Sequence, residues 1–133
     1  MPTVDLRADY TYTVARSDNT GSELLRRPKN KASLDADWTP IDPLTLTGEI
    51  LRVGTWLDST RDNPILFTAQ AAPYTLVNLA AAYRVNANAT FFGRVNNLLD
   101  QHYQEPLGFL APSLTLIAGV RVSWGGEAAG NPN

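Results

Sequence analysis

The chain has 133 residues, enough for one ordinary domain, and a net charge of −2, so no strong field directs it to nucleic acid. The absence of cysteine excludes disulfides, thiolate metal sites and cysteine nucleophiles. No stretch is apolar over the roughly 18 residues that a membrane helix needs, and the charged first 20 residues are not expected to be a signal peptide.

The first predicted element is a strand over residues 6–14. Its apolar positions share one face: Leu6, Ala8, Tyr10, Tyr12 and Val14. Polar residues fill the alternate positions, which is typical of a β-strand with one apolar and one wet face. Residues 16–29 are rich in charge and turn formers, so we expect a long loop there.

The middle of the chain predicts two more strands. Residues 32–38 alternate clearly, and the two prolines of the TPIDP segment, residues 39–43, are expected to end that strand in a tight turn. A weaker pattern predicts a third strand over residues 44–57. A second long loop is expected over residues 58–73.

Three further strands are predicted over residues 74–85, 89–96 and 113–124, with the third long loop at residues 97–112. Residues 125–133 show no periodicity and are expected to form a disordered tail.

Long and short connections therefore alternate along the chain. Outer-membrane barrels show this asymmetry, with short periplasmic turns and long extracellular loops. Trp38, Tyr83 and Trp124 lie near the short-turn ends, as an interfacial aromatic girdle would. The predicted fold class is all-β: an antiparallel meander of about six amphipathic strands, part of a transmembrane β-barrel.

The segment that begins at Gly93 resembles the carboxyl-terminal hallmark of TonB-dependent receptors, a V-x-N-L-x-D-x-x-Y pattern after the penultimate strand. The matching residues are Val95, Asn97, Leu98, Asp100 and Tyr103. The family's next loop and its terminal aromatic residue are matched by Gly108, Phe109, Pro112 and Trp124. Arg26-Arg27-Pro28 is similar to the family's R-R-P loop end.

The resemblance covers residues 5–124 and implies a barrel segment over residues 1–124. The family's barrel has about 22 strands and a plug, so six strands imply a carboxyl-terminal fragment that does not transport alone. By resemblance, the parent receptor lies in the cell outer membrane and imports ferric siderophore or cobalamin-like cargo. Its implied partners are outer-membrane lipid, the plug and other strands, TonB through the missing plug, and the barrel assembly machinery, which would recognise Trp124.

Residues around the predicted loops are candidates for binding. Arg26, Arg27 and Lys29, with Lys31, form a basic cluster that could hold lipopolysaccharide phosphates or an anionic ligand, or could simply be solvated.

Two residues of the receptor motif have a predicted structural role. Asn97 and Asp100 are expected to satisfy backbone N–H groups in a local turn. Tyr103 offers an amphipathic ring to the membrane interface.

Nothing in the sequence supports catalysis, a metal site or a cofactor. His102, the only histidine, is expected to be a solvated loop residue, because no nucleophile and orienting partner accompany it. Two acidic groups lack the spacing of calcium loops and are expected to be solvated: Asp18, Asn19 and Glu23, and Asp58, Asp62 and Asn63. Motifs of hydrolases, P-loop proteins and zinc enzymes are absent, so we expect no enzyme.

Two other architectures are compatible with the alternation. One is a small soluble β-barrel or β-sandwich that acts as a binding module, with its apolar faces packed on one another. The other is an oligomeric barrel to which each chain contributes six strands. The wet-face charges Asp35, Asp37, Arg94 and Arg121 would line a barrel lumen or face solvent, and the sequence pattern is the same for both.

Overall fold

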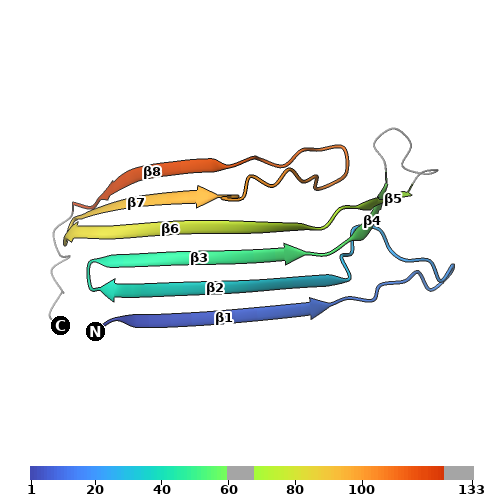
Figure 1. The fold of residues 1–133 in the computed structure, drawn as a ribbon, viewed down its shortest axis with the longest axis horizontal. Coiled ribbons are helices and arrows are strands. Elements are labelled where there is room, and N and C mark those ends of the chain that lie inside the picture. Colours follow the sequence, from blue (N-terminus) through green and yellow to red (C-terminus); the bar gives the residue numbers. More distant parts are fainter. Residues whose placement is uncertain (60–67, 125–133) are drawn as a thin grey trace, which may run out of the picture.

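The computed structural model describes residues 1–59 and 68–124. Six long strands form one antiparallel sheet in the order β1-β2-β3-β6-β7-β8, and two short strands form a separate hairpin, β4-β5 (Figure 1). The strands are β1 (Thr3–Tyr12), β2 (Asn30–Ile41), β3 (Leu44–Val53), β4 (Trp56–Ser59), β5 (Thr68–Ala71), β6 (Tyr74–Asn86), β7 (Ala89–Asn96) and β8 (Thr115–Val122). The predicted all-β meander is confirmed. Over the described ranges, no helix is long and apolar enough to cross a membrane.

The connections alternate in length as predicted. Residues 42–43 and 87–88 make the short turns at one end of the sheet, which we call the turn end (Figure 1). The three long connections meet at the opposite end, the loop end, and comprise residues 13–29, 54–73 and 97–114. The small hairpin β4-β5 belongs to the second of them.

The strand register turns the alternation of each strand into a continuous apolar face. Partner residues align across the whole sheet, so apolar side chains of all six strands fall in common rows. One such row consists of Leu6, Ala36, Gly48, Leu79, Val95 and Leu116. The row next to it, toward the turn end, consists of Val4, Trp38, Leu46, Ala81, Gly93 and Ala118.

This apolar face has no covering layer among the described strands. Leu34, Ile50 and Leu79 lie on inner strands of the sheet and are still 43%, 44% and 43% exposed. A sandwich would place a second sheet about 10 Å above these side chains. The soluble sandwich alternative is therefore not what the described strands form. The described strands β1 and β8 are the two edges of the sheet, and no ladder joins them.

The second strand ends within residues 39–43 in a tight turn, as predicted, but Pro40 does not stop it. β2 continues through Pro40 to Ile41. The pairing of β2 with β3 shifts between Trp38 and Ile41, so Pro40 lies in an irregular part of the ladder. Proline is tolerated at such a bulge because it has no N–H to donate.

The predicted strand over residues 44–57 begins where it was expected, but its predicted end is wrong, since β3 ends at Val53 and a separate strand, β4, begins at Trp56. A Cβ atom at Gly54 would lie 3.0 Å from the backbone oxygen of Asn30, and the Gly54 N–H donates to that same oxygen. Glycine allows this close approach, and the chain leaves the sheet there. The predicted loop over residues 58–73 contains the end of β4 and all of β5.

The last predicted strand, over residues 113–124, is too long, because β8 covers only Thr115–Val122. The Ser123 N–H still donates to the oxygen of Asn88. The predicted disordered tail, residues 125–133, lies outside the described residues.

On the wet face, the ring of Phe92 lies over Gly119, its partner on β8. A Cβ atom at residue 119 would lie 2.6 Å from Cζ of Phe92. We expect Gly119→Val to lower the free energy of unfolding by about 1–3 kcal/mol, because the ring must leave its place. Urea unfolding of the detergent-solubilised protein measures this loss.

Two controls separate this contact from a general effect of a side chain in the sheet. Gly119→Val combined with Phe92→Ala should recover most of the lost stability. Gly93→Val places its Cβ on the other face, where the nearest atom, the oxygen of Ile117, is 3.9 Å away, and should be neutral. Equal losses for both glycine variants would contradict the expected contact.

Candidate functional site

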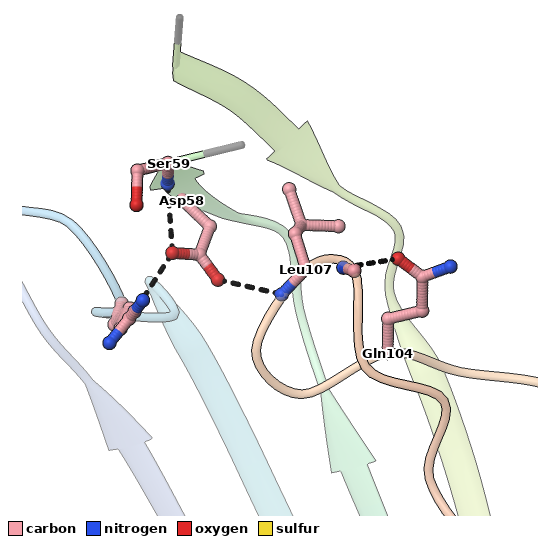
Figure 2. A network of polar contacts seen from close by, with 6 residues as sticks. Asp58, Ser59, Gln104 and Leu107 are labelled. Carbon is pink, nitrogen blue, oxygen red and sulfur yellow. Dashed lines mark hydrogen bonds and ion pairs between the residues drawn. The ribbon is translucent and has the colours of Figure 1, made fainter. Parts of the chain in front are cut away.

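The three long connections meet at one buried carboxylate. Asp58, on β4, has a side chain that is 0% exposed. Its Oδ1 accepts hydrogen bonds from Nε of Arg26 at 2.8 Å and from the N–H of Ser59 at 2.8 Å. Its Oδ2 accepts a bond from the N–H of Leu107 at 3.0 Å (Figure 2). We call Asp58, Arg26 and Leu107 the loop clasp.

Local backbone conformation and hydrogen bonds position Arg26 and Leu107 to donate to Asp58. Arg26 has a left-handed φ of 58°, and its own N–H donates to the oxygen of Leu57 at 2.7 Å. Arg26 therefore binds β4 through both its backbone and its guanidinium group. On the other side, Oε1 of Gln104 accepts the N–H of Gly108, which holds the turn that presents Leu107 (Figure 2).

The electrostatics of the loop clasp favour the ionised carboxylate. Burial alone would raise the pKa of Asp58. The hydrogen bond from Arg26, the backbone N–H groups of Leu107 and Ser59, and the positive charge of Arg26 outweigh burial and hold this pKa below its usual 3.8. Asp58 is therefore an anion at neutral pH, with donors from three separate segments.

A small aromatic cluster lies beside the loop clasp. Trp56 meets Tyr74 edge to face, with ring centroids 6.0 Å apart, and Tyr103 stacks on Tyr74 at 4.2 Å. The hydroxyl of Tyr74 donates to Glu105. Burial, and then the charge of Glu105, raise the pKa of Tyr103. The described core of the protein is here, around Val53, Trp56, Ala71 and Tyr74.

The position of Tyr103 corrects its predicted role at the membrane interface. Its loop folds back on the sheet end, where the N–H of Ala111 donates to the Tyr103 oxygen. Its half-buried ring packs on Tyr74 rather than pointing to the apolar face. Tyr74 pairs with Val53 and belongs to the wet-face alternation, so the cluster packs on the wet side of the sheet.

Asn97 closes the base of the last long connection. Its side chain is nearly buried, and its φ of 52° is left-handed. Oδ1 accepts the N–H of Gln101 at 2.9 Å, while Nδ2 donates to the oxygens of Gln101 at 3.0 Å and Pro112 at 3.2 Å. Asp100, with a φ of 48°, accepts the N–H of Leu114. Asn97 accepts a backbone N–H in its local turn as expected, whereas Asp100 accepts one from the far side of the connection, at Leu114.

The other residues of the receptor motif are spread out. Val95 lies in the apolar row, and Leu98 is partly exposed and donates its N–H to the oxygen of Val77. Trp124 is 87% exposed and follows the last strand.

The predicted basic cluster is divided in the structure. Arg26 is bound in the loop clasp, and Lys29 forms an ion pair with Glu23. Arg27 is exposed, and the described residues offer it no ion pair. The Thr13 N–H donates to the oxygen of Lys29 and extends the ladder of β1 and β2, so Lys29 falls on the wet face with Lys31.

The members of the two acidic groups that the structure describes do not converge on a metal site. No cluster of three potential ligands occurs in the described ranges. The expected solvation of Asp58 is wrong, because the loop clasp buries it, and Asp62 and Asn63 lie outside the described residues. Asp18, Asn19 and His102 are exposed, as a solvated loop requires.

The wet-face charges do not pair with one another in the described part of the chain. Asp37 accepts a bond from the Thr47 hydroxyl, and Arg94 donates to Asn96. These side chains remain open to a partner on the wet face.

Sequence reasoning missed Asp58 and Glu105 as the acids that organise the loop end. A signal for Asp58 was present: it follows Trp56 by two residues, so it shares the buried face of a short strand. No such signal marks Arg26 as its partner, since 32 residues separate the two.

The sequence and the fold are both similar to those of known receptors. A protein-family model described as "TonB dependent receptor-like, beta-barrel" matches residues 3–98. The pyoverdine outer-membrane receptor FpvA of Pseudomonas aeruginosa has a similar fold, with a TM-score of 0.76 and 23% identity over 91% of this chain and 19% of that one.

Two further receptors have the same fold. The ferric enterobactin receptor PfeA of P. aeruginosa has a TM-score of 0.73 and 18% identity over 91% of this chain and 20% of its own. The ferric-catecholate import receptor Fiu of E. coli has a TM-score of 0.69 and 19% identity over 90% of this chain and 18% of its own. The chain thus spans about a fifth of the length of these receptors. At this identity, the likeness to solved structures shows the fold.

Proposed function

The chain belongs to the TonB-dependent receptor family, whose barrel model matches residues 3–98, and from this membership we propose that it forms the carboxyl-terminal wall of an outer-membrane importer of ferric siderophore or cobalamin-like cargo. The observation that supports this proposal best is the six-stranded sheet, which has one uncovered apolar face and one polar face. At one end of the sheet, its long connections pack over the polar face. On this proposal the protein is a transporter segment rather than an enzyme.

The exposed aromatic residues support a bilayer on the apolar face. Tyr10 and Tyr12 lie on this face at the loop end, and Trp38, Tyr83 and Phe91 lie on it near the turn end. Two aromatic belts at the ends of such strands are typical of outer-membrane barrels. The turn end would then be periplasmic, and the loop end would face outward.

The loop end would contribute to ligand capture. Arg26 is occupied by Asp58, so Arg27 and Lys29 are the members of the basic cluster that could hold an anionic cargo or lipopolysaccharide phosphate. The wet-face position of Lys29 favours a ligand in the barrel mouth over a lipid. The rest of the barrel, the plug that engages TonB, and the assembly machinery that would read Trp124 complete the proposed set of partners.

Transport can be tested with the full receptor that carries this segment, in cells that lack other iron and cobalamin receptors. We expect TonB-dependent uptake of one of three labelled probes: ferric pyoverdine, ferric enterobactin or cyanocobalamin. The protein should be found in the outer-membrane fraction. The proposal would be contradicted if residues 1–133, expressed without detergent, gave a soluble monomer that melts cooperatively.

A further inference from the structure

One charged side chain lies on the apolar face of the sheet. Arg52 follows Gly48 and Ile50 at every second position of β3, so its exposed side chain shares their face. The other charged residues of the six long strands occupy the alternate positions and face the wet side. An arginine that faces lipid is costly in the middle of a bilayer and much less so near its surface. The position and the neighbours of Arg52 therefore decide how its charge is accommodated.

Arg52 lies at the loop end of the apolar face. Leu44, at the opposite end of β3, pairs with Tyr83, one of the aromatic residues near the turn end. At about 3.4 Å per residue and a strand tilt of about 40°, Arg52 is roughly 20 Å from that level, and the apolar band of such a barrel is about 25 Å tall. Arg52 also shares a row with the belt residue Tyr10, with only Ala32 between them. On the membrane placement proposed above, its guanidinium group is at the level of the outer-leaflet head groups.

Polar groups of four neighbouring strands lie around this position. Nη1 of Arg52 donates to the hydroxyl oxygen of Thr75 at 2.8 Å, which ties the side chain across β3 and β6. On the other side, the Tyr10 hydroxyl donates to Oδ1 of Asn30 at 2.7 Å, so Nδ2 of this amide is left as a donor. The small residue Ala32 lies between Tyr10 and Arg52, whose strands are about 10 Å apart. The space above Ala32 is therefore bounded by hydrogen-bond donors.

The charge of Arg52 has no anionic partner in the described part of the chain, where the ion pairs involve other cations. A guanidinium group has five N–H donors, and the bond to Thr75 uses one of them. Phosphate suits the remaining donors, because it offers several acceptor oxygens in a geometry that matches the guanidinium fork. Next to Arg52 on the same face, Leu34 and Ile50 are 43% and 44% exposed. A ligand there meets a cation and an apolar surface side by side.

We propose that Arg52, together with Thr75 and Asn30, binds a phosphate monoester on the head group of an outer-leaflet glycolipid. This inference rests on the membrane placement proposed above and goes beyond it, because it assigns one anion site to one arginine. A phosphorylated glycolipid matches both parts of the surface, with its phosphate at Arg52 and its apolar part on Leu34 and Ile50. Free phosphate would use the donors alone and leave the apolar part uncovered.

The test uses the full receptor in detergent, with lipid A and its enzymatically dephosphorylated form as probes. Native mass spectrometry counts the lipids that each receptor retains during a titration. We expect Arg52→Gln to retain one lipid A molecule fewer, with about tenfold weaker binding at that site, the effect of losing one charge-assisted contact. Binding of the dephosphorylated form should not change. Thr75→Val should weaken lipid A binding by a smaller factor, because the guanidinium group keeps its charge and loses only its fixed position.

Arg94→Gln is the matched control, because Arg94 also donates to one neighbouring side chain, that of Asn96, but lies on the wet face. This variant should bind lipid A as the unchanged receptor does. Equal lipid A binding by Arg52→Gln and Arg94→Gln would overturn the phosphate site and leave the membrane placement intact. Displacement of lipid A by inorganic phosphate would overturn the glycolipid as the ligand. A receptor that is absent from the outer-membrane fraction would overturn the membrane placement and the site together.

Discussion

Replacing Asp58 with alanine is expected to release all three long connections at once and to lower the local stability of the loop end by about 3 kcal/mol. The change leaves the N–H groups of Leu107 and Ser59 without their acceptor in a partly buried place, where each such group costs at least the lower part of about 1–3 kcal/mol. Loss of the Arg26 contact adds less, because that side chain is 61% exposed and its charge is screened. Hydrogen exchange of the Leu107 amide measures the release directly.

Two variants check this expectation. Asp58→Asn keeps the shape and one acceptor oxygen, so its effect should be smaller than that of alanine. Asp18→Ala removes an exposed carboxylate from the same end of the molecule and should change nothing. Full protection of the Leu107 amide in Asp58→Ala would show that the loops are held by other contacts.

The stability of the loop clasp should also depend on pH, and it should fall only on the acid side. The pKa of Asp58 is lower in the folded protein than its usual 3.8, so its stabilising effect is complete above that value and is lost as pH falls through the folded pKa. Loop protection should therefore stay constant from neutral pH to about pH 5 and decline below about pH 4. Asp58→Asn should lack that decline.

Asn97→Asp is expected to cost about 2–4 kcal/mol, although the two side chains have the same shape. The change replaces the donating Nδ2 with an oxygen that faces the backbone oxygens of Gln101 and Pro112 in a site that is only 4% exposed. Aspartate and asparagine both tolerate the left-handed φ, so the loss reports the missing donor and the buried charge, and not backbone strain. Thermal unfolding in detergent gives the difference.

The neighbouring asparagine supplies the control for this variant. Asn96 lies on the wet face and accepts a bond from Nε of Arg94 at 2.6 Å. An aspartate at residue 96 would accept the same bond with a full negative charge, so Asn96→Asp should be neutral or slightly stabilising. Equal melting temperatures for Asn97→Asp and the unchanged protein would contradict the structural role of Asn97.

Strand identity and strand faces were predictable because they depend on local alternation. The faces of Leu6 and Leu116 follow from a period of two. The short turns force only β2 with β3 and β6 with β7 to be antiparallel neighbours. The strand ends were less predictable. Whether Pro40 stops a strand or lies in a bulge depends on its partner strand, and Gly54 ends β3 only because Asn30 approaches it.

Within the candidate site, too, the local hydrogen bonds could be predicted from sequence and the contacts between distant segments could not. Asn97 accepts the N–H of Gln101 within its own turn, so motif and chemistry together indicated that role, whereas the bonds to Pro112 and from Leu114 to Asp100 cross the base of the connection and were not predictable. Asp58 acts between segments that lie far apart in sequence, since its carboxylate accepts hydrogen bonds from Arg26 and from the N–H of Leu107. Alternation carries no information on which distant arginine or amide meets a given carboxylate.

The shared carboxylate at Asp58 also limits how this receptor segment can be recombined with others. Consider a chimaera in which only residues 97–114 come from another receptor. Its loop would have to place a backbone N–H where that of Leu107 now lies, or Asp58 would lose that hydrogen bond and keep only its contacts within the other two segments. Residues 13–29, the β4-β5 hairpin and residues 97–114 thus form one transplantable unit. Grafting or epitope design at the loop end should exchange the three together and leave the strands below them untouched.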